Sequence, residues 1–525
     1  NNRRSSQTAR KYACKTVNTV RMKSTEIKEF INEIDILRDL DHPNTVQLFE
    51  TFAVKRKIWI VTDLCSGGDL GTRIRKVNMT ETDSVLVVEQ ILRAIAYMHK
   101  RNVCHRDIKL ENIMYSDDSP DALVKLIDFG LSNKFAKGEK MLKACGTAYT
   151  AAPEILSGQG ITEQSDIWSI GVVTFILLSN EYPFITDLKD LENESKKFKL
   201  EEARYVFSSA WKKRGVSEHG KEFVANCLKK HPGERWDAVD ALDFVQKVWI
   251  PFLVEEGQEK KKKLLSAAET EKTKVEGEGQ VEVVTSLSAE GADKQTNLDK
   301  EMRETEQQQQ KLERSIAVMR KRTKMKSHML EGMKTYALYG EMKKRILMTI
   351  AYTMDKGDLK ELSHIFNVMD SNSSGTITLM ELKSALHEMQ AKNHLEEATL
   401  EKLFKDIDID NSGEIHYAEF LAAVSESQGL VTQERLADAF DRLDSEGKGY
   451  INKEDLKRIL GSDYNEDLVH KMLEECDSNK NGNIDYDEFL RLMFDKDPKK
   501  GMETTVGSTR NLYLDESMVE KMGVL

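Results

Sequence analysis

The stretch that decides the fold reads His105-Arg106-Asp107-Ile108-Lys109-Leu110-Glu111-Asn112, and a second motif, Asp128-Phe129-Gly130, follows it. Phosphoryl transfer needs a carboxylate to orient the attacking hydroxyl and oxygen ligands to hold Mg²⁺ against the phosphates. The two motifs supply such groups within a short part of the chain. Either motif alone arises by chance, so their weight comes from their occurrence together and in this order.

In this order the motifs resemble the catalytic loop and the metal-binding motif of protein kinases. The resemblance implies that Asp107 is the catalytic base and that Asn112 and Asp128 hold Mg²⁺. It also implies that Lys109 neutralises charge on the transferring phosphoryl group. Lysine at this position is typical of serine/threonine kinases, so the implied acceptor is a protein hydroxyl.

The same resemblance implies an ATP site around a strand lysine and the helix that follows it. The pair formed by that lysine and a helix glutamate would orient the phosphates, and residues 60–65 resemble the hinge that faces adenine. Thr62 would be the gatekeeper, and the backbone of Asp63 and Cys65 would face adenine. Asp69 would bond the ribose, and Met114 would form the floor of the adenine pocket. The implied ATP-binding residues are Lys15, Glu33, Thr62, Asp63, Cys65, Asp69 and Met114.

Further positions fit the kinase pattern outside the reacting groups. Residues 146–154 resemble the end of an activation segment, and the resemblance pairs Glu154 with Arg235 and makes Asp166 a support of the catalytic loop. Lys143 stands where many kinases carry a phosphorylated threonine, so another trigger is expected. Cys104 and Cys145 lie near the site, and we interpret them as buried, unreactive thiols.

One departure leaves an alternative open. The Gly-rich loop of protein kinases cannot fit ahead of Lys15, because residues 1–8 contain no glycine. The simpler interpretation is a sequence truncated at its N-terminus. The alternative is a calcium-sensing pseudokinase scaffold that binds partners without transferring phosphate.

An internal repeat of helix, acidic loop and helix occupies the last third of the chain, with loops that open at Asp370, Asp408, Asp444 and Asp477. An EF-hand loop supplies oxygens at positions 1, 3, 5, 7 and 9 and a bidentate glutamate at position 12, with glycine at position 6. Three loops carry this pattern in full. Their predicted calcium ligands are Asp370, Asn372, Ser374, Thr376 and Glu381; Asp408, Asp410, Ser412, Glu414 and Glu419; and Asp477, Asn479, Asn481, Asn483 and Glu488.

The third loop departs from the pattern. Its candidate ligands are Asp444, Glu446, Tyr450 and Asp455, but Lys448 places an ammonium at position 5 and aspartate replaces glutamate at position 12. We expect this site to bind calcium weakly or not at all.

Composition sets the class of protein. The chain has 525 residues, a net charge of −11 and 39% hydrophobic residues, which indicates several globular domains and argues against nucleic-acid binding. We found no apolar run long enough for a transmembrane segment. The predicted fold is an α+β bilobal protein kinase fold followed by an all-α calmodulin-like domain with two EF-hand pairs. The predicted parts are a kinase domain (1–254), a flexible linker (255–299), a helical autoinhibitory junction (300–356), the EF-hand domain (357–495) and a tail (496–525).

Taken together, the order of these parts is similar to that of the calcium-dependent protein kinases of plants and protists. The resemblance implies ATP, Mg²⁺ and Ca²⁺ as cofactors and a junction helix as an intramolecular partner. A basic run at 320–326 would mimic the substrate, and Leu338, Met342, Ile346 and Ile350, at steps of four, would form the apolar face of a junction helix. Glu111 implies substrates with basic residues before the target serine or threonine. We expect a cytoplasmic or nuclear protein, with membrane attachment by N-terminal acylation left open.

Overall fold

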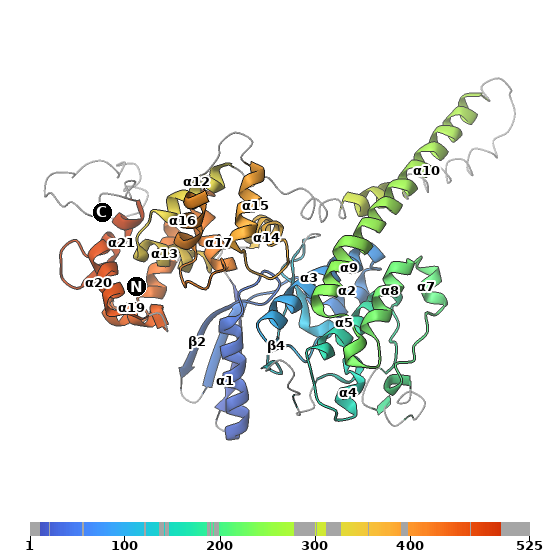
Figure 1. Cartoon of the computed structure of the whole chain (residues 1–525), viewed down its shortest axis with the longest axis horizontal. Helices are drawn as coiled ribbons and strands as arrows, with labels where there is room; N and C mark the ends of the chain where they lie inside the picture. Colours follow the sequence, from blue (N-terminus) through green and yellow to red (C-terminus); the bar gives the residue numbers. More distant parts are fainter. Residues whose placement is uncertain are drawn as a thin grey trace. The chain divides into compact units, whose positions relative to one another are not determined.

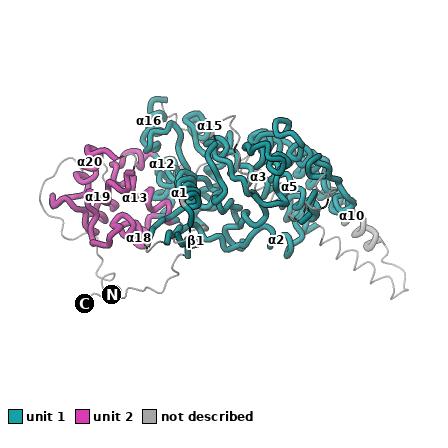
Figure 2. The backbone as a smooth tube through the Cα atoms, turned by 90° about the horizontal axis from the view of Figure 1, so that it is seen from below, with its two compact units in different colours: residues 1–333, 354–430 teal, residues 334–353, 431–525 magenta. Residues whose placement is uncertain are grey.

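The computed structural model falls into two compact units, residues 1–333 with 354–430 and residues 334–353 with 431–525 (Figure 2). The boundary after Leu430 separates the two EF-hand pairs, which the sequence placed in one domain. The structure describes residues 11–494 except 20–21, 55–56, 120–121, 136–140, 142–145, 186–188, 191–192, 194–198, 278–299, 301, 311–326, 355, 390–396 and 462–463. Lys143, Cys145 and the basic run at 320–326 therefore lie outside the described residues.

A three-stranded antiparallel sheet begins the first unit, with β3 (Lys57–Asp63) between β1 (Tyr12–Asn18) and β2 (Leu48–Val54). Helix α1 (Ser24–Asp39) lies alongside this sheet (Figure 1). The helix starts where the Glu26 carboxylate accepts a hydrogen bond of 2.8 Å from the Lys23 amide. This sheet and helix carry the lysine and the glutamate of the expected nucleotide site.

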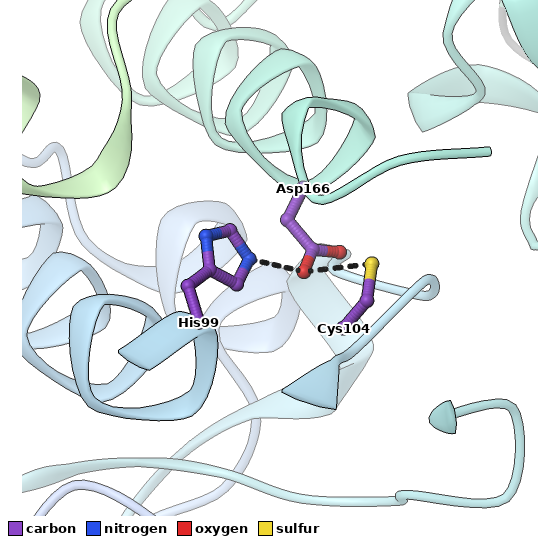
Figure 3. Close-up of side chains that lie close together, drawn as sticks. All are labelled: His99, Cys104 and Asp166. Atoms are coloured by element: carbon purple, nitrogen blue, oxygen red, sulfur yellow. Dashed lines mark hydrogen bonds and ion pairs between the residues drawn. The ribbon is translucent and has the colours of Figure 1, made fainter. Parts of the chain in front are cut away.

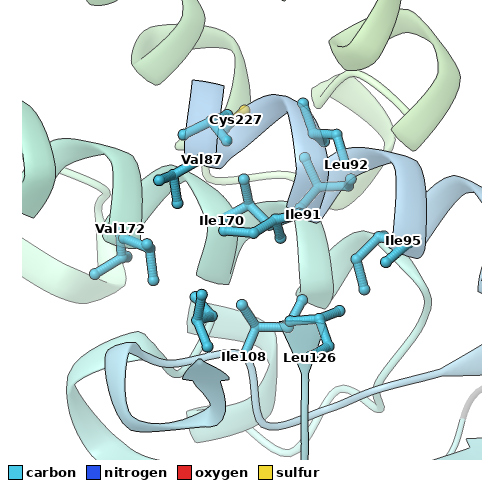
Figure 4. Close-up of a cluster of buried hydrophobic side chains, with 14 of the residues drawn as sticks. Val87, Ile91, Leu92, Ile95, Ile108, Leu126, Ile170, Val172 and Cys227 are labelled. Carbon is cyan, nitrogen blue, oxygen red and sulfur yellow. The ribbon is translucent and has the colours of Figure 1, made fainter. Parts of the chain in front are cut away.

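A mainly helical lobe follows the sheet. Helix α5 (Gln164–Ser179) is buried from Ser165 to Ser179 and is mostly apolar after its first turn, as expected for the central helix of a core. It packs against α3 (Glu81–Lys100) and α8 (Glu218–Cys227), and Figure 4 shows side chains that meet between these elements. The other elements are α2 (Leu70–Lys76), β4 (Val103–Cys104), η2 (Leu110–Asn112), β5 (Ile113–Tyr115), β6 (Val124–Leu126), β7 (Asn133–Lys134), η3 (Ala148–Thr150), α4 (Pro153–Leu156), α7 (Ser209–Lys213), η5 (Pro232–Glu234), α9 (Ala238–Phe244) and η6 (Val245–Trp249).

The structure differs from the prediction of a flexible linker at residues 255–299. Its first part belongs to α10 (Ile250–Gly277), a long helix, while residues 278–299 lie outside the described residues. Composition misled here because the segment is polar but rich in Glu, Lys, Leu and Ala, which favour helix and allow charge pairs at steps of three or four. The expectation of a flexible segment is therefore wrong for residues 255–277.

The four predicted EF-hands are present. In the first unit α14 (Lys356–Met369) and α15 (Leu379–Met389) pair with α16 (Glu397–Ile407) and α17 (Tyr417–Ser425) through a bridge between Ile377 and Ile415. In the second unit β8 and β9 join the two hands, with Ile451 opposite Ile484. The elements of the second pair are α18 (Gln433–Leu443), β8 (Tyr450–Asn452), α19 (Lys453–Leu460), α20 (Glu466–Cys476), β9 (Asn483–Asp485) and α21 (Tyr486–Phe494).

Residues 327–351 of the junction form two helices rather than one continuous face. Helix α12 (Ser327–Ala337) ends before Leu338, which is 52% exposed, and α13 (Glu341–Ala351) starts after Gly340. Met342, Ile346 and Ile350 are fully buried, so the predicted apolar face is wrong only at Leu338. Among the described helices, none is long and apolar enough to cross a membrane.

Candidate active site and calcium loops

The carboxylate of Asp107 lies at the centre of a dense hydrogen-bond network. Its Oδ2 accepts from Lys109 Nζ at 2.7 Å and from Asn112 Nδ2 at 3.0 Å, and its Oδ1 accepts from Thr147 Oγ1 at 2.7 Å. The Lys109 ammonium also donates to Thr147 Oγ1 at 2.9 Å. This network fixes the orientation of the carboxylate that would receive a proton. The sequence interpretation did not predict that Thr147 belongs to it. Its place directly after Gly146, in the segment already assigned as activation segment, was the available signal.

Asp166 anchors the catalytic loop, as expected. Its Oδ2 accepts from the His105 amide at 2.9 Å and its Oδ1 from the Arg106 amide at 2.8 Å. The side chains of His99 and Cys104 also contact Oδ2, at 2.9 and 3.2 Å (Figure 3). Because these donors already use the carboxylate, we interpret the cluster as a structural anchor rather than a metal site.

Burial and hydrogen bonding set the titration of this anchor. Burial alone would raise the pKa of Asp166, but the hydrogen bond from His99 and the charges of His99 and His105 lower the pKa below its ordinary value. Burial raises the pKa of the Cys104 thiol well above its usual range, and the Asp166 charge adds to this effect. Cys104 is therefore a buried, unreactive thiol, as expected.

The nucleotide side of the site brings together three charged groups from separate elements. Lys15 Nζ on β1 lies 2.6 Å from Glu33 Oε1 on α1 and 3.4 Å from Asp128 Oδ1. Burial alone would lower the pKa of Lys15, but the hydrogen bond and charge of Glu33 raise it. Burial raises the pKa of Glu33 despite its lysine partner. Lys15 thus stays charged where the phosphates of ATP would need it.

The remaining ATP positions lie around the end of β3. Thr62 and Asp63 end that strand, Cys65 follows it, and Met114 on β5 forms a bridge with Asp69. The side chain of Asp63 pairs with Lys125 Nζ at 2.9 Å, and its backbone amide donates to the Gln47 carbonyl at 3.1 Å. The carboxylate of Asp69 caps α2, where its Oδ1 accepts from the Thr72 amide at 2.7 Å. The predicted ribose contact of Asp69 would have to share that carboxylate.

Two side-chain contacts stabilise the part of the site where the protein substrate would bind. Arg235 pairs in a bidentate fashion with Glu154, at 2.7 and 2.8 Å, and both side chains are almost fully buried, which confirms the expected structural pair. Tyr149 donates its hydroxyl to Glu111 Oε2 at 2.8 Å. Glu111 is exposed, so its carboxylate remains accessible from solvent.

The first and fourth loops have the turn that calcium coordination needs. The position 6 amides of Gly375 and Gly482 donate to the position 1 carboxylates of Asp370 and Asp477, both at 2.7 Å. Both glycines adopt positive φ, +76° and +79°. In both loops the position 5 amide also donates to side-chain oxygens at positions 1 and 3, and the position 12 glutamate accepts from the position 3 amide.

The second loop gathers its carboxylates most tightly. One oxygen each from Asp408, Asp410 and Glu419 lies within 4.8 Å of the others. Burial raises the pKa of Glu419 to about 8, and nearby aspartates add to this shift. Oxygen donors of like charge held this close fit a hard divalent cation, so the residues present fit calcium.

The third loop holds an internal cation. Lys448 Nζ lies 2.8 Å from Asp455 Oδ2 and 3.3 Å from Glu446 Oε2, so it pairs with carboxylates at positions 12 and 3. The hydrogen bond that the Lys448 ammonium donates to Asp455 raises the pKa of Lys448, and the charges of both carboxylates add to this effect. This arrangement supports the prediction of a weak or silent third site.

We expect the double variant Lys448→Asn with Asp455→Glu to gain a calcium site. The changes remove the ammonium and restore the bidentate carboxylate at position 12. Calorimetry should count three sites in the parent chain and four in the variant, while Lys453→Asn, a matched surface change nearby, should still show three. Four equal sites in the parent chain would contradict the prediction.

Comparisons with known proteins agree with this geometry. The model of the protein kinase domain matches residues 2–250, and that of the EF-hand domain pair matches residues 359–425 and 433–494. Calcium-dependent protein kinase 3 of Plasmodium berghei (strain Anka) is 32% identical over 492 residues, which cover 92% of this chain and 75% of the relative. The chain belongs to the calcium-dependent protein kinase family.

Other relatives of this family are similar over the same extent. Calcium-dependent protein kinase 4 of Plasmodium falciparum (isolate 3D7) is 30% identical over 511 residues, 93% of this chain and 82% of the relative. Calcium-dependent protein kinase 5 of the same organism is 28% identical over 475 residues, 89% of this chain and 70% of the relative. Membership implies ATP and Mg²⁺ for the kinase domain and Ca²⁺ for the EF-hands.

Proposed function

We propose that this protein is a calcium-activated serine/threonine protein kinase that transfers the γ-phosphate of ATP to protein hydroxyls. The observation that carries this proposal is the joint placement of Lys15, Glu33 and Asp128 beside one another and of Lys109 and Asn112 around Asp107. A pseudokinase scaffold would not need these groups held together, so the alternative loses its support.

In the proposed mechanism Asp107 orients the substrate hydroxyl and accepts its proton. Lys109, which already bonds Asp107, would neutralise charge on the transferring phosphoryl group. Asn112 and Asp128 would hold Mg²⁺; the amide nitrogen of Asn112 donates to the Asp107 carbonyl at 2.9 Å, which leaves the amide oxygen for the metal. Lys15 would bind the phosphates and stay oriented by Glu33.

The second EF-hand pair supports the proposed role of the junction. Helix α13 packs against α18 and α20, and its Met342, Ile346 and Ile350 are fully buried. Glu475 on α20 caps the start of this helix, since its Oε1 and Oε2 accept from the amides of Glu341 and Met342 at 2.9 and 3.0 Å. We infer that this pair captures α13, as EF-hand pairs bind amphipathic helices.

A side chain at Gly340 would prevent this cap. A Cβ atom there would lie 2.3 Å from Glu475 Cδ, closer than any such contact allows. Calcium opening of an EF-hand pair exposes an apolar groove for such a helix. We propose that capture of α13 draws the basic run at 320–326 away from the catalytic cleft.

We also propose that the protein acts in the cytoplasm or the nucleus.

An assay of the full chain with ATP and Mg²⁺ tests this function. We expect strong phosphorylation of a peptide with arginine before its serine in calcium, at least about tenfold less in chelator, and weak phosphorylation of the matched peptide with glutamate at those positions. The exposed carboxylate of Glu111 is the reason for the basic preference. Equal rates in calcium and chelator would contradict the switch, and preference for the acidic peptide would contradict the role of Glu111.

A further inference from the structure

Tyr182 is a large aromatic side chain that stays 44% exposed although its loop is anchored on both sides. Before it, the Asn180 amide at the end of α5 donates to the Ile176 carbonyl at 2.7 Å. After it, the Phe184 ring stacks on Trp168 with centroids 5.2 Å apart. These anchors hold Tyr182 in place, so its exposed ring belongs to a defined surface of the kinase domain.

The ring of Tyr182 lies beside the catalytic loop, because both contact Tyr149. The rings of Tyr182 and Tyr149 meet edge to face, with centroids 5.4 Å apart and an interplanar angle of 87°. The Tyr149 hydroxyl accepts from the Leu110 amide at 3.0 Å and donates to Glu111 Oε2 at 2.8 Å. Tyr149 thus connects Tyr182 to the carboxylate that we assign to basic substrates.

Burial keeps Tyr149 in this connecting role. Burial raises the pKa of Tyr149 above its ordinary value, and the hydrogen bond to Glu111 and the charge of Glu111 add to the rise. The phenol therefore stays protonated and continues to donate to Glu111. The Tyr149 side chain is 7% exposed, so it supports the two exposed groups from beneath and presents little surface of its own.

Both exposed groups have room for a ligand. An ionised carboxylate has about four lone-pair sites, and Tyr149 uses one of those on Glu111. In an edge-to-face pair Tyr149 covers at most one face of the Tyr182 ring, so another face stays open. An acceptor of hydrogen bonds and an aromatic face are therefore available next to each other.

The charge around Tyr182 favours a cation. The preceding residue, Glu181, is exposed, and its Oε2 accepts from Ser208 Oγ at 2.6 Å. An aromatic face is itself the negative side of the ring. The cation–ring contacts among the described residues involve other rings, such as the Arg73 guanidinium over Tyr115 at 4.1 Å. A cation for the open face of Tyr182 would come from the substrate.

Arginine fits this pair of groups better than lysine does. The N–H groups of a guanidinium lie in its plane and can donate to a carboxylate while the flat face stacks on an aromatic ring. An ammonium is a compact and strongly hydrated charge without a flat face, so it gains less from the ring. Glu111 would attract either cation, whereas Tyr182 would distinguish them.

We propose that Tyr182 is a specificity-determining residue that stacks on the guanidinium bound by Glu111 and selects substrates with arginine, in preference to lysine, before the target serine or threonine. The inference rests on the proposed function, because it names the substrate residue that Glu111 receives.

Peptide kinetics of the full chain in calcium, ATP and Mg²⁺ test this selection. Two serine peptides are compared that differ only in carrying arginine or lysine before the serine. For the parent chain we expect kcat/KM to be about fivefold higher with the arginine peptide, mainly through a lower KM. Tyr182→Ala should bring the two peptides within about twofold of each other, and Tyr182→Phe, which keeps the aromatic face, should retain the preference.

The ratio between the two peptides separates recognition from a structural defect. If Tyr182→Ala only disturbed Tyr149 and Glu111, both peptides would lose the same factor and the ratio would stay at its parent value. Phe52→Ala, which removes a ring that is 40% exposed on β2, should also leave the ratio unchanged.

Three results would overturn the selection by Tyr182: equal kcat/KM for both peptides in the parent chain, a parent-like ratio in Tyr182→Ala, or loss of the ratio in Tyr182→Phe. Failure of the parent chain to phosphorylate either basic peptide would instead overturn the proposed function.

Discussion

Replacement of Asp107 with asparagine is expected to lower phosphoryl transfer by about 10²–10⁴-fold, the usual contribution of a general base. The change keeps the shape of the side chain but removes the carboxylate that would accept the proton of the substrate hydroxyl. Lys109 and Thr147 would lose a charged partner, yet both can bond to each other. Turnover at saturating ATP and peptide should fall, while the KM for ATP should change little.

Folding and binding measurements distinguish a chemical defect from a structural one. Asp107→Asn should melt within a few degrees of the parent chain and bind the same number of calcium ions. Asp243→Asn, an equal change in an exposed pair, should keep full activity. A variant that retains parent-like turnover would refute the assignment of Asp107.

The catalytic groups were predictable because each lies in a short contiguous motif. Asp107, Asn112 and Asp128 could be assigned from neighbouring residues, and the fixed pattern of an EF-hand loop did the same for Asp370 and its partners. Thr147 escaped because its bond to Asp107 depends on how a distant segment folds back. Its place directly after Gly146 in the activation segment was the available signal, but that place does not identify Asp107 as the partner.

The sequence prediction failed where a local pattern was overridden by, or gave no sign of, contacts with distant parts of the chain. The spacing of Leu338 agreed with a helix face, but α12 ends at Ala337 and α13 starts after Gly340, so Leu338 lies outside both helices and is 52% exposed. The bond between Arg93 and Ser373 joins residues 280 positions apart, and no local pattern marks either one. Contacts of this kind require the folded unit, because burial and complementary shape create them.

The second large effect is expected at Ile346, on the apolar face of α13. Its side chain is fully buried where α13 packs against α18 and α20. A carboxylate there would have to be buried without a partner, which costs several kcal/mol. Switching a kinase from mostly off to mostly on takes roughly 5 kcal/mol of differential binding. The loss at this one position is therefore comparable to the whole free energy of the proposed switch.

We accordingly expect Ile346→Asp to remove calcium activation, at least about tenfold, while the low activity in chelator stays as it is. Leu338→Asp is the matched control, because Leu338 precedes α13 by a few residues and is 52% exposed. It should retain full activation. Calorimetry should still find calcium at the fourth loop of Ile346→Asp, which shows that the second EF-hand pair remains folded. If Ile346→Asp is instead fully active in chelator, α13 itself holds the kinase off in the resting state, and its capture by the second pair is part of inhibition rather than release.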